Sequence, residues 1–143
     1  MSDYKVLLVD DEAEFVSVLA ERLEARGLAV DTAVTGLSAV VRAEENRYDA
    51  IVLDMAMPGM DGIETLERLL ELNPDLQVIL LTGQATPAQA AAAIKLGALD
   101  LLEKPADVGT LVRKIEDAAN RRWSLEDKRI EDRVADIIRK KGW

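Results

Sequence analysis

The sequence predicts an α/β fold in which a parallel sheet of five strands is covered by helices on both faces. Short apolar runs alternate five times with longer segments of helical period, the alternation typical of strand–helix–strand units. Several of the short runs are apolar throughout, which indicates strands buried on both faces. Parallel strands need long crossover connections, and right-handed crossovers make such a sheet doubly wound.

The strands are expected at five places. Residues 5–9 (KVLLV), 50–53 (AIVL) and 77–81 (QVILL) carry the clearest apolar runs. Residues 28–32 (LAVDT) and 99–102 (LDLL) carry weaker versions of the same pattern. All five together give a sheet of ordinary size.

Helices are expected between and after these strands, because apolar residues recur there at helical spacing. The recurring residues are Phe15, Val18, Leu19 and Leu23 in the first helix, Leu37, Val40, Val41 and Ala43 in the second, and Ile63, Leu66, Leu69 and Leu70 in the third. Residues 87–96 are rich in alanine and stop at Gly97, and residues 107–122 continue the pattern through Leu111, Val112, Ile115 and Ala119. Gly27 stands where the C-cap of the first helix is expected.

The chain is expected to divide into a domain over residues 1–122 and a C-terminal helical extension over residues 123–143. Ser124 and Asp127 resemble a capping box, with Asp in place of the usual Glu or Gln. Beyond them, one helix face carries four aliphatic residues: Ile130, Val134, Ile137 and Ile138. This extra helix either folds back on the domain or continues the fifth helix, or it serves dimerisation or partner docking; periodicity does not choose between them.

Composition excludes several classes of function. The formal net charge of −9 argues against direct binding of nucleic acid, which needs clustered Lys and Arg. The chain has no cysteine and no histidine, so disulfides, thiolate chemistry and histidine-based triads are excluded. No apolar run approaches the roughly 20 residues that span a bilayer, and the N-terminus lacks the pattern of a signal peptide. A soluble cytoplasmic protein is therefore expected.

Polar side chains follow four of the predicted strands at the point where each strand ends. Asp10 and Asp11 follow the first strand, Asp54 the third, Thr82 the fourth and Lys104 the fifth. Ligands of open parallel sheets bind beyond the carboxyl ends of the strands, so these groups are expected at one rim. Each has an ordinary structural explanation, as a helix cap, a turn residue or a solvated lysine, but their joint placement favours a site.

The chemistry of such a site follows from its charges. Three carboxylates brought together repel one another unless a cation neutralises them, and Mg²⁺ accepts carboxylate, water and phosphate oxygens as ligands. An ionised Asp is a competent nucleophile toward phosphorus. Lys104 supplies a second positive charge for a phosphoryl group, and the Thr82 hydroxyl a hydrogen bond. The pattern therefore indicates phosphoryl transfer to a carboxylate.

Four motifs in order carry a resemblance to a known family: VLLVDDE (6–12), IVLDMAMPGMDG (51–62), VILLTG (78–83) and KLGALDLLEKP (95–105). Over about residues 3–122 the sequence resembles the receiver domain of bacterial two-component response regulators, in a stand-alone, chemotaxis-regulator-like form. The resemblance implies a flavodoxin-like sheet with the strand order 2-1-3-4-5.

The resemblance also implies roles for individual residues. Asp54 matches the phosphoacceptor, and Thr82 and Lys104 match the switch hydroxyl and the phosphate-binding lysine. Asp10, Asp11 and Asp54, with the backbone carbonyl of Ala56, match the ligands of Mg²⁺ or Mn²⁺. A receiver of this kind catalyses only its own phosphorylation and dephosphorylation and is not otherwise an enzyme.

Further positions are expected to shape the site. The Lys104–Pro105 bond is expected to be cis, and Gly62 to need a positive φ in the turn that opens the third helix. Ala56 and Gln84 stand at the positions that tune phosphate lifetime in the family. The family's switch aromatic stands three residues before the lysine, where this chain has Leu101, so the coupling of phosphorylation to output is expected to be weaker or differently built.

The implied partners are proteins. The phosphodonor is expected to be a sensor histidine kinase or a histidine phosphotransfer protein, and no effector domain is seen after the receiver. Output is expected through protein contacts, at the face of the fourth helix, fifth strand and fifth helix, where residues 88–93 are rich in alanine. A homodimer through this face or through the C-terminal helix is one form of such output; neither nucleic acid nor membrane is expected as a direct partner.

Three rival interpretations compete with this one. A haloacid-dehalogenase-like phosphatase needs an acid two residues after its nucleophile, where this chain has Ala56. A flavodoxin-like electron carrier needs a Gly- and hydroxyl-rich loop after the first strand, where this chain has Asp10, Asp11 and Glu12. The third alternative is a receiver fold that serves as a docking module independent of phosphorylation, and Leu101 keeps it open.

Overall fold

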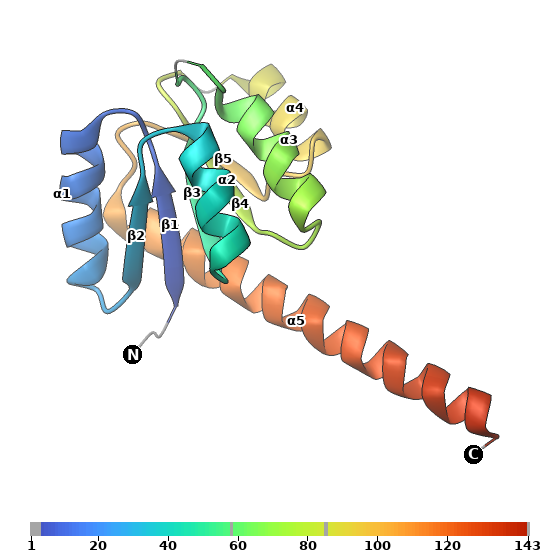
Figure 1. Cartoon of the computed structure of the whole chain (residues 1–143). Helices are drawn as coiled ribbons and strands as arrows, with labels where there is room; N and C mark the ends of the chain where they lie inside the picture. The colour runs from blue at the N-terminus through green and yellow to red at the C-terminus, as the bar shows by residue number, and fades with distance from the viewer. Residues whose placement is uncertain (1–3, 58, 85, 143) are drawn as a thin grey trace.

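A computed structural model of the chain describes residues 4–57, 59–84 and 86–142. Five parallel strands form one sheet in the order β2-β1-β3-β4-β5, as Figure 1 shows. The strands are β1 (Lys5–Val9), β2 (Ala29–Ala33), β3 (Ala50–Asp54), β4 (Val78–Thr82) and β5 (Asp100–Glu103). The predicted fold class and strand order are confirmed, and each strand lies within one residue of the predicted position.

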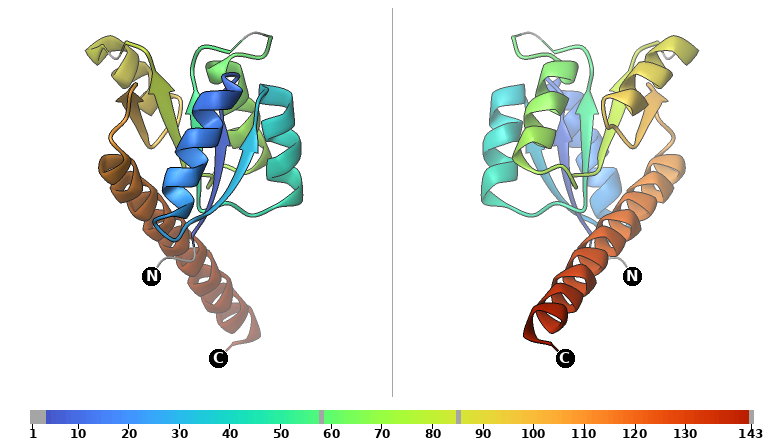
Figure 2. Two further views of the ribbon diagram at one scale, coloured as in Figure 1. Left: turned by 90° about the vertical axis from the view of Figure 1, so that its left-hand side faces the viewer. Right: turned by 90° about the vertical axis from the view of Figure 1, so that its right-hand side faces the viewer.

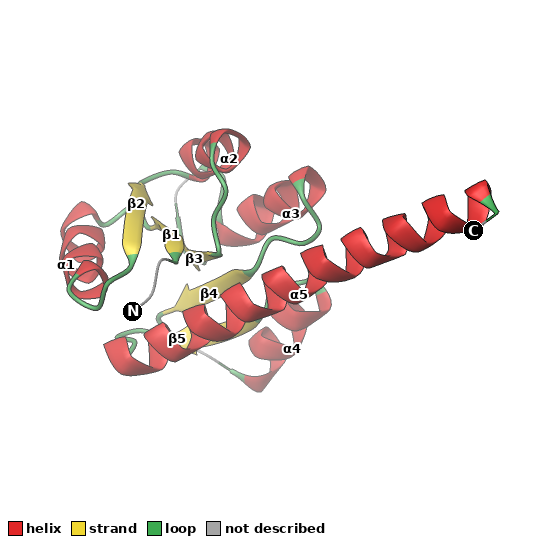
Figure 3. Ribbon diagram, turned by 90° about the horizontal axis from the view of Figure 1, so that it is seen from below, coloured by secondary structure: helices red, strands yellow, loops and turns green. Residues whose placement is uncertain are grey.

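The helices divide between the two faces of the sheet (Figures 2 and 3). They are α1 (Ala13–Glu24), α2 (Gly36–Glu45), α3 (Gly62–Leu72), α4 (Pro87–Lys95) and α5 (Val108–Lys141). Side chains that alternate along a strand point to opposite faces: Leu7 joins the core under α2, α3 and α4, whereas Val6 and Leu8 join the core under α1 and α5. The domain is therefore a three-layer sandwich with one core on each side of the sheet.

The helical faces differ in detail from the prediction. Val18, Leu37 and Val41 belong to the apolar periodicity that predicted the first two helices, but they are between 43% and 64% exposed. The small residues Ala20 and Ala39 are buried instead. The apolar residues of each helix are compatible with two neighbouring buried faces. Close packing of a helix on a sheet favours the face that carries the smaller side chains.

The fifth helix is 34 residues long and continues far beyond the sheet (Figure 1). Its N-cap is Asp107, whose side chain accepts a hydrogen bond from the N–H of Thr110, and its C-cap is Gly142, in the left-handed conformation. Ser124 lies inside this helix, so the capping signal there was wrong. Of the two placements predicted for the C-terminal helix, folding back on the domain or continuing the fifth helix, the structure has the second, up to Lys141. A role in dimerisation or partner docking stays a prediction. Residues 1–3 and 143, at the ends of the two predicted segments, lie outside the described residues.

A largely buried ion pair fastens the middle of α5 to the amino end of the sheet. Arg122 donates to Asp49 at 2.7 Å, and the Trp123 indole donates to the same carboxylate oxygen at 3.3 Å. The other oxygen of Asp49 accepts the backbone N–H of Lys5 at 2.8 Å. The Trp123 ring also packs edge-on against Tyr4. These contacts fix the direction in which α5 leaves the domain.

Replacing Arg122 with leucine is expected to lower the free energy of unfolding by about 2 kcal/mol. Breaking a buried pair leaves a charge without its partner, which costs about 3–5 kcal/mol when nothing compensates. Here Lys5 and Trp123 still donate to Asp49, so the expected cost is smaller. Urea unfolding of Arg122→Leu and of the control Arg121→Leu, one position away on the same helix, measures the change in the free energy of unfolding. Equal stability of the two variants would contradict a stabilising role for the pair of Arg122 and Asp49.

None of the described helices has the length and apolar character needed to cross a membrane.

Candidate functional site

The polar residues predicted to form a site do meet at the carboxyl end of the sheet. Asp10 directly follows β1, Asp54 is the last residue of β3, Thr82 is the last residue of β4, and Lys104 directly follows β5. Because all the strands are parallel, these ends lie at one edge, although the residues span most of the sequence.

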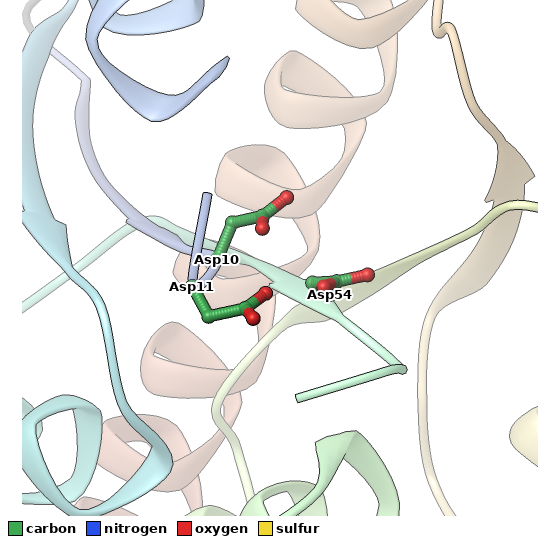
Figure 4. A group of neighbouring side chains, drawn as sticks. All are labelled: Asp10, Asp11 and Asp54. Atoms are coloured by element: carbon green, nitrogen blue, oxygen red, sulfur yellow. The ribbon is translucent and has the colours of Figure 1, made fainter. Parts of the chain in front are cut away.

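Asp10, Asp11 and Asp54 form an acidic cluster at this edge (Figure 4). One carboxylate oxygen from each lies within 4.8 Å of the others, and among the described residues this is the one such group of acidic side chains. Asp10 and Asp54 are each only 3% exposed, whereas Asp11 is open to solvent. The cluster thus combines two buried carboxylates with one at the rim.

The loop after β1 fixes the orientation of Asp10. Its backbone N–H donates to Ala33 at the end of β2, and its Oδ1 accepts the N–H of Glu12 at 2.9 Å. The N-cap of α1 is Glu12, whose side chain makes no capping hydrogen bond. Neither Asp10 nor Asp11 is therefore the N-cap of α1, and the carboxylate of Asp11 is available for another role.

Lys104 reaches across the site from the end of β5. Its Nζ lies 2.7 Å from Asp10 Oδ2 and 3.2 Å from Asp54 Oδ1. The ammonium also sits 4.8 Å from the centre of the Phe15 ring, a cation–π contact on the side toward α1. The sequence identified Phe15 only as part of the apolar periodicity of the first helix. It packs against the core under α1 and α5, and its contact with Lys104 has no local signal in the sequence.

The charges of the site perturb one another. Burial and the neighbouring Asp10 charge raise the pKa of the Asp54 carboxyl, although Lys104 opposes the rise. Burial alone lowers the pKa of Lys104, but its hydrogen bonds with Asp10 and Asp54 outweigh burial, and the net pKa is raised. Lys104 is therefore firmly charged, and Asp54 is a carboxylate held in an unfavourable environment.

The donor set fits a hard divalent cation. Three carboxylates with one lysine leave a formal charge of −2 at a partly open rim, and oxygen ligands with room for water suit Mg²⁺. Asp10, Asp11 and Asp54 are the side chains that could hold it, and the adjacent carbonyl of Ala56 is a further candidate. Such an ion would neutralise the repulsion that raises the pKa of Asp54.

Adding Mg²⁺ to metal-free protein is expected to raise its melting temperature. At about ten times the dissociation constant, binding to the folded state contributes ~1.4 kcal/mol, which corresponds to roughly 4 °C for a domain of this size. Asp11→Asn should abolish this rise without harming the fold, because Asp11 is exposed. Asp132→Asn, on the exposed part of α5, is the matched control, and a rise that survives in Asp11→Asn would contradict the assigned ligand set.

Thr82 and the predicted tuning residues lie around Asp54. Thr82 is buried, and its hydroxyl lies 3.3 Å from the backbone N of Gln84 and 3.4 Å from the carbonyl of the same residue. The N–H of Ala56 donates to Asp54 Oδ1 at 3.4 Å. The side chains of Ala56 and Gln84 are both exposed. Among the residues that the structure describes, the Thr82 hydroxyl makes these two long contacts, both to the loop that follows it.

Leu101 is buried in the core on the side of α2, α3 and α4. It pairs with Leu80 across β4 and β5, two residues before Thr82 on β4. The position at which the family resemblance implies an aromatic ring therefore holds an aliphatic side chain that is buried in the core.

The predictions for Pro105 and Gly62 had different outcomes. The Lys104–Pro105 bond is cis, as predicted. Gly62 does not have a positive φ, so that prediction was wrong. Glycine is required there for space: a Cβ would lie 2.4 Å from the Cα of Met55 and 2.6 Å from the carbonyl oxygen of Asp54. The loop after Asp54 therefore packs directly against the start of α3.

Gly62→Ala is expected to destabilise the protein by about 2–3 kcal/mol, because the atoms in its way are backbone and cannot rotate aside. The displaced loop should also weaken the stabilisation by Mg²⁺. Gly83→Ala provides the comparison, since a Cβ there meets nothing within 4 Å. Thermal unfolding of both variants with and without Mg²⁺ tests this; a Gly62 variant as stable as the Gly83 variant would refute the steric argument.

Comparisons with known proteins agree on one family. Residues 6–116 match the family model described as "Response regulator receiver domain". The chain is 37% identical over 120 residues to the transcriptional regulatory protein PrrA of Mycobacterium tuberculosis, covering 84% of this chain and 52% of PrrA. It is 38% identical over 115 residues to the photosynthetic apparatus regulatory protein RegA of Rhodobacter capsulatus, covering 80% of this chain and 62% of RegA. The chain thus spans about half the length of the curated relatives it matches.

Solved structures give the same result. A response regulator receiver domain protein from Clostridium thermocellum superposes with a TM-score of 0.80 at 32% identity, covering 85% of this chain and 98% of that one. A response regulator from Burkholderia pseudomallei, solved with a phosphorylated aspartic acid, a calcium ion and citrate, superposes with a TM-score of 0.74 at 27% identity. It covers 98% of this chain and 86% of that one.

Proposed function

The chain belongs to the response regulator receiver domain family, and from this premise we propose that Asp54 accepts a phosphoryl group in a Mg²⁺-dependent reaction and thereby switches protein contacts. The observation that carries the proposal is the meeting of Asp10, Asp11, Asp54 and Lys104 at the carboxyl end of the sheet. The phosphorylated aspartic acid and calcium ion of the Burkholderia pseudomallei regulator support it.

In the proposed reaction a carboxylate oxygen of Asp54 attacks the phosphorus of a phosphohistidine on a partner protein. The new O–P bond forms as the N–P bond of the donor breaks, and the leaving imidazole nitrogen takes up a proton from solvent. The product is an acyl phosphate on Asp54. Burial and the Asp10 charge raise the pKa of the Asp54 carboxyl, and a cation nearby would act in the opposite direction and favour the ionised, nucleophilic form.

Each remaining group has a separate task. Lys104 Nζ lies 3.2 Å from Asp54 Oδ1 and can form an ion pair with a phosphoryl oxygen once Asp54 carries the phosphoryl group. Phe15 limits the movement of the ammonium on the side toward α1. Asp10, Asp11, Asp54 and the carbonyl of Ala56 would hold Mg²⁺ or Mn²⁺, which would supply neutralising charge for the transferred group. Gln84 and Ala56 flank the site from exposed loops and would set how easily water reaches the phosphoryl group.

The signal would pass through Thr82. Its hydroxyl makes long contacts to the backbone of Gln84 and can turn toward a phosphoryl oxygen, and this movement would bias the loop after β4 and the start of α4. Because Leu101 is aliphatic and buried, the change would reach the face of α4, β5 and α5 by repacking of the loop and not by rotation of a ring.

The partners are inferred from the family. A sensor histidine kinase or a histidine phosphotransfer protein would supply the phosphoryl group, and a protein contact would carry the output. The relatives PrrA and RegA are regulatory proteins longer than the matched region, so whether this receiver acts alone is part of the proposal. Cytoplasmic location is likewise proposed, because phosphorelay partners act there.

The proposal is tested by intact-protein mass spectrometry after incubation with acetyl phosphate, with and without Mg²⁺. One added phosphoryl group that requires Mg²⁺, is sensitive to hydroxylamine and maps to the peptide containing Asp54 would support it. If no mass is added even after a rapid quench, beryllofluoride with Mg²⁺ is added and Trp fluorescence and NMR shifts are recorded. A response to beryllofluoride would indicate rapid hydrolysis, whereas no response would overturn the proposal in favour of a docking module that is independent of phosphorylation.

A further inference from the structure

The projecting part of α5 carries an apolar stripe that the domain does not cover. Ile130, Val134, Ile137 and Ile138 are between 38% and 61% exposed. The domain holds α5 through a different side, because Arg122 pairs with Asp49 and Arg129 with Asp75. At 3.6 residues per turn these anchoring arginines lie roughly 115° around the helix from the middle of the stripe. The stripe therefore faces away from the chain's own body, and Figure 1 shows α5 extending past the sheet.

Charged residues at the two ends of the stripe would pair with those of a second copy of α5 in one orientation. Asp127, Ile130, Val134, Ile138 and Lys141 share one face of the helix, and their spacing is symmetric about Val134. If a second copy of the helix runs antiparallel with Val134 on the two-fold axis, Ile130 meets Ile138 of the other copy and Asp127 meets Lys141. In a parallel arrangement in register, Asp127 would face Asp127 and Lys141 would face Lys141.

The charge of the whole chain favours the same orientation. Residues 126–141 hold six of the 18 Lys and Arg and five of the 27 Asp and Glu, so the rest of the chain carries a formal net charge of −10. A parallel pair would bring two such bodies to the same end of the helices, where they repel each other. An antiparallel pair separates the bodies and brings the basic end of each α5 (Arg139, Lys140 and Lys141) near the acidic body of the other copy.

We propose that the projecting part of α5 is a dimer interface, in which residues 127–141 of two copies pair antiparallel about Val134. The interface is isologous, since the same face of both copies takes part. It covers about 22 Å of helix and lies at the low end of specific interface sizes, so the dimer should be reversible and depend on concentration. The inference goes beyond phosphoryl transfer, and it does not depend on it.

The oligomeric state of the full chain tests the proposal directly. Sedimentation or light scattering should show the mass rising from 15.7 kDa toward twice that value as the protein concentration rises through the micromolar range. Val134→Asp should abolish this rise, because two carboxylates would then face each other on the axis. Ala135→Asp adds the same side chain at the next position, outside the stripe, and should leave the dimer unchanged. Circular dichroism of both variants verifies that α5 still forms.

Disulfide trapping tests the orientation, since the chain has no cysteine of its own. In the antiparallel pair, two copies of residue 130 lie about 12 Å apart along the axis, beyond the roughly 7 Å that a disulfide tolerates. Ile130→Cys alone and Ile138→Cys alone should therefore not cross-link, whereas a mixture of the two should. Cross-linking of Ile130→Cys with itself would show a parallel pair and overturn the proposal.

Two further outcomes would also overturn it. A chain that stays monomeric at all concentrations would assign the stripe to a different protein partner. A dimer that survives Val134→Asp would assign self-association to another surface, such as the face of α4, β5 and α5. Charge reversal offers an independent check: Asp127→Lys and Lys141→Asp should each weaken the dimer, and the double variant should restore it.

Discussion

Replacing Asp54 with asparagine is expected to abolish phosphorylation and, at the same time, to make the unphosphorylated protein harder to unfold at pH 7. The first effect follows because the amide is not a nucleophile toward phosphorus. The second follows because Asp54 is 3% exposed and lies beside Asp10, and burial followed by that charge raises the pKa of its carboxyl. A neutral amide of the same shape removes the repulsion and can still accept a hydrogen bond from Lys104.

The pH dependence of the stabilisation has a definite sign. The folded protein holds the Asp54 proton to higher pH than the unfolded chain, where the carboxyl titrates near its ordinary value of 3.8. Stability therefore falls as pH rises from that value through the raised pKa, and each unit of the rise costs about 1.4 kcal/mol once the group is ionised. The Asp54→Asn variant lacks this loss, so its stability advantage over the native protein should be smallest below the unfolded value and grow as pH increases.

Urea unfolding of both proteins in EDTA from acid to neutral pH measures the difference. Asp117→Asn, on the exposed side of α5, makes the same chemical change and should alter neither phosphorylation nor stability. Mg²⁺ should narrow the gap, because its binding to the proposed site of the native protein would add stability. If the Asp54→Asn variant were less stable than the native chain at pH 7 without metal, the electrostatic description of the site would be wrong.

The fold was predictable because its signals are local and repeated. An apolar run such as 50–53 indicates a strand that is buried on both faces, as in a parallel sheet covered by helices, and the crossover rule then leaves few arrangements. The order of the strands came from the family resemblance. The exposure of Val18 on α1 and of Val41 on α2 was harder to predict, because periodicity alone does not decide between neighbouring helix faces when alanines are available.

The residues of the site were predictable because parallel strands bring their ends together, so Asp10, Asp54, Thr82 and Lys104 were expected at one edge. The contacts that tune the site were not. Phe15 under Lys104 depends on the angle of α1, and the space at Gly62 depends on how the loop after Asp54 folds back. Neither of these two packing features produces a periodic pattern in the sequence.

The full length of the last helix could have been predicted from the sequence. The chain has no glycine or proline between Gly109 and Gly142, and the helical period runs through that whole stretch. The Ser124 capping pattern was weaker than this continuity, because a cap needs a break before it. The pair of Arg122 and Asp49, 73 residues apart, could not be predicted from either segment alone.

The second large effect is expected at Lys104. Lys104→Met keeps the length and apolar stem of the side chain and removes its charge, which faces Asp10 at 2.7 Å and Asp54 at 3.2 Å. Loss of a preorganised cation from a charge-developing site typically costs a factor of about 10²–10³ in rate. The rate of Asp54 phosphorylation by acetyl phosphate should fall by that factor, and the appearance of the phosphorylated mass over time measures it.

The same substitution should also show how much Lys104 contributes to the stability of the fold. Without it two buried carboxylates face each other unneutralised, and the free energy of unfolding in EDTA should drop by about 3 kcal/mol. Mg²⁺ should restore much of this loss, so the gain in melting temperature from the metal should be larger than in the native chain. Lys114→Met, which removes a half-exposed lysine paired with Asp100 at 2.8 Å, is the control and should affect neither rate nor metal response. If Lys104→Met lowered the stability but left the phosphorylation rate unchanged, Lys104 would be a neutralising residue for the metal-free site and not a participant in phosphoryl transfer.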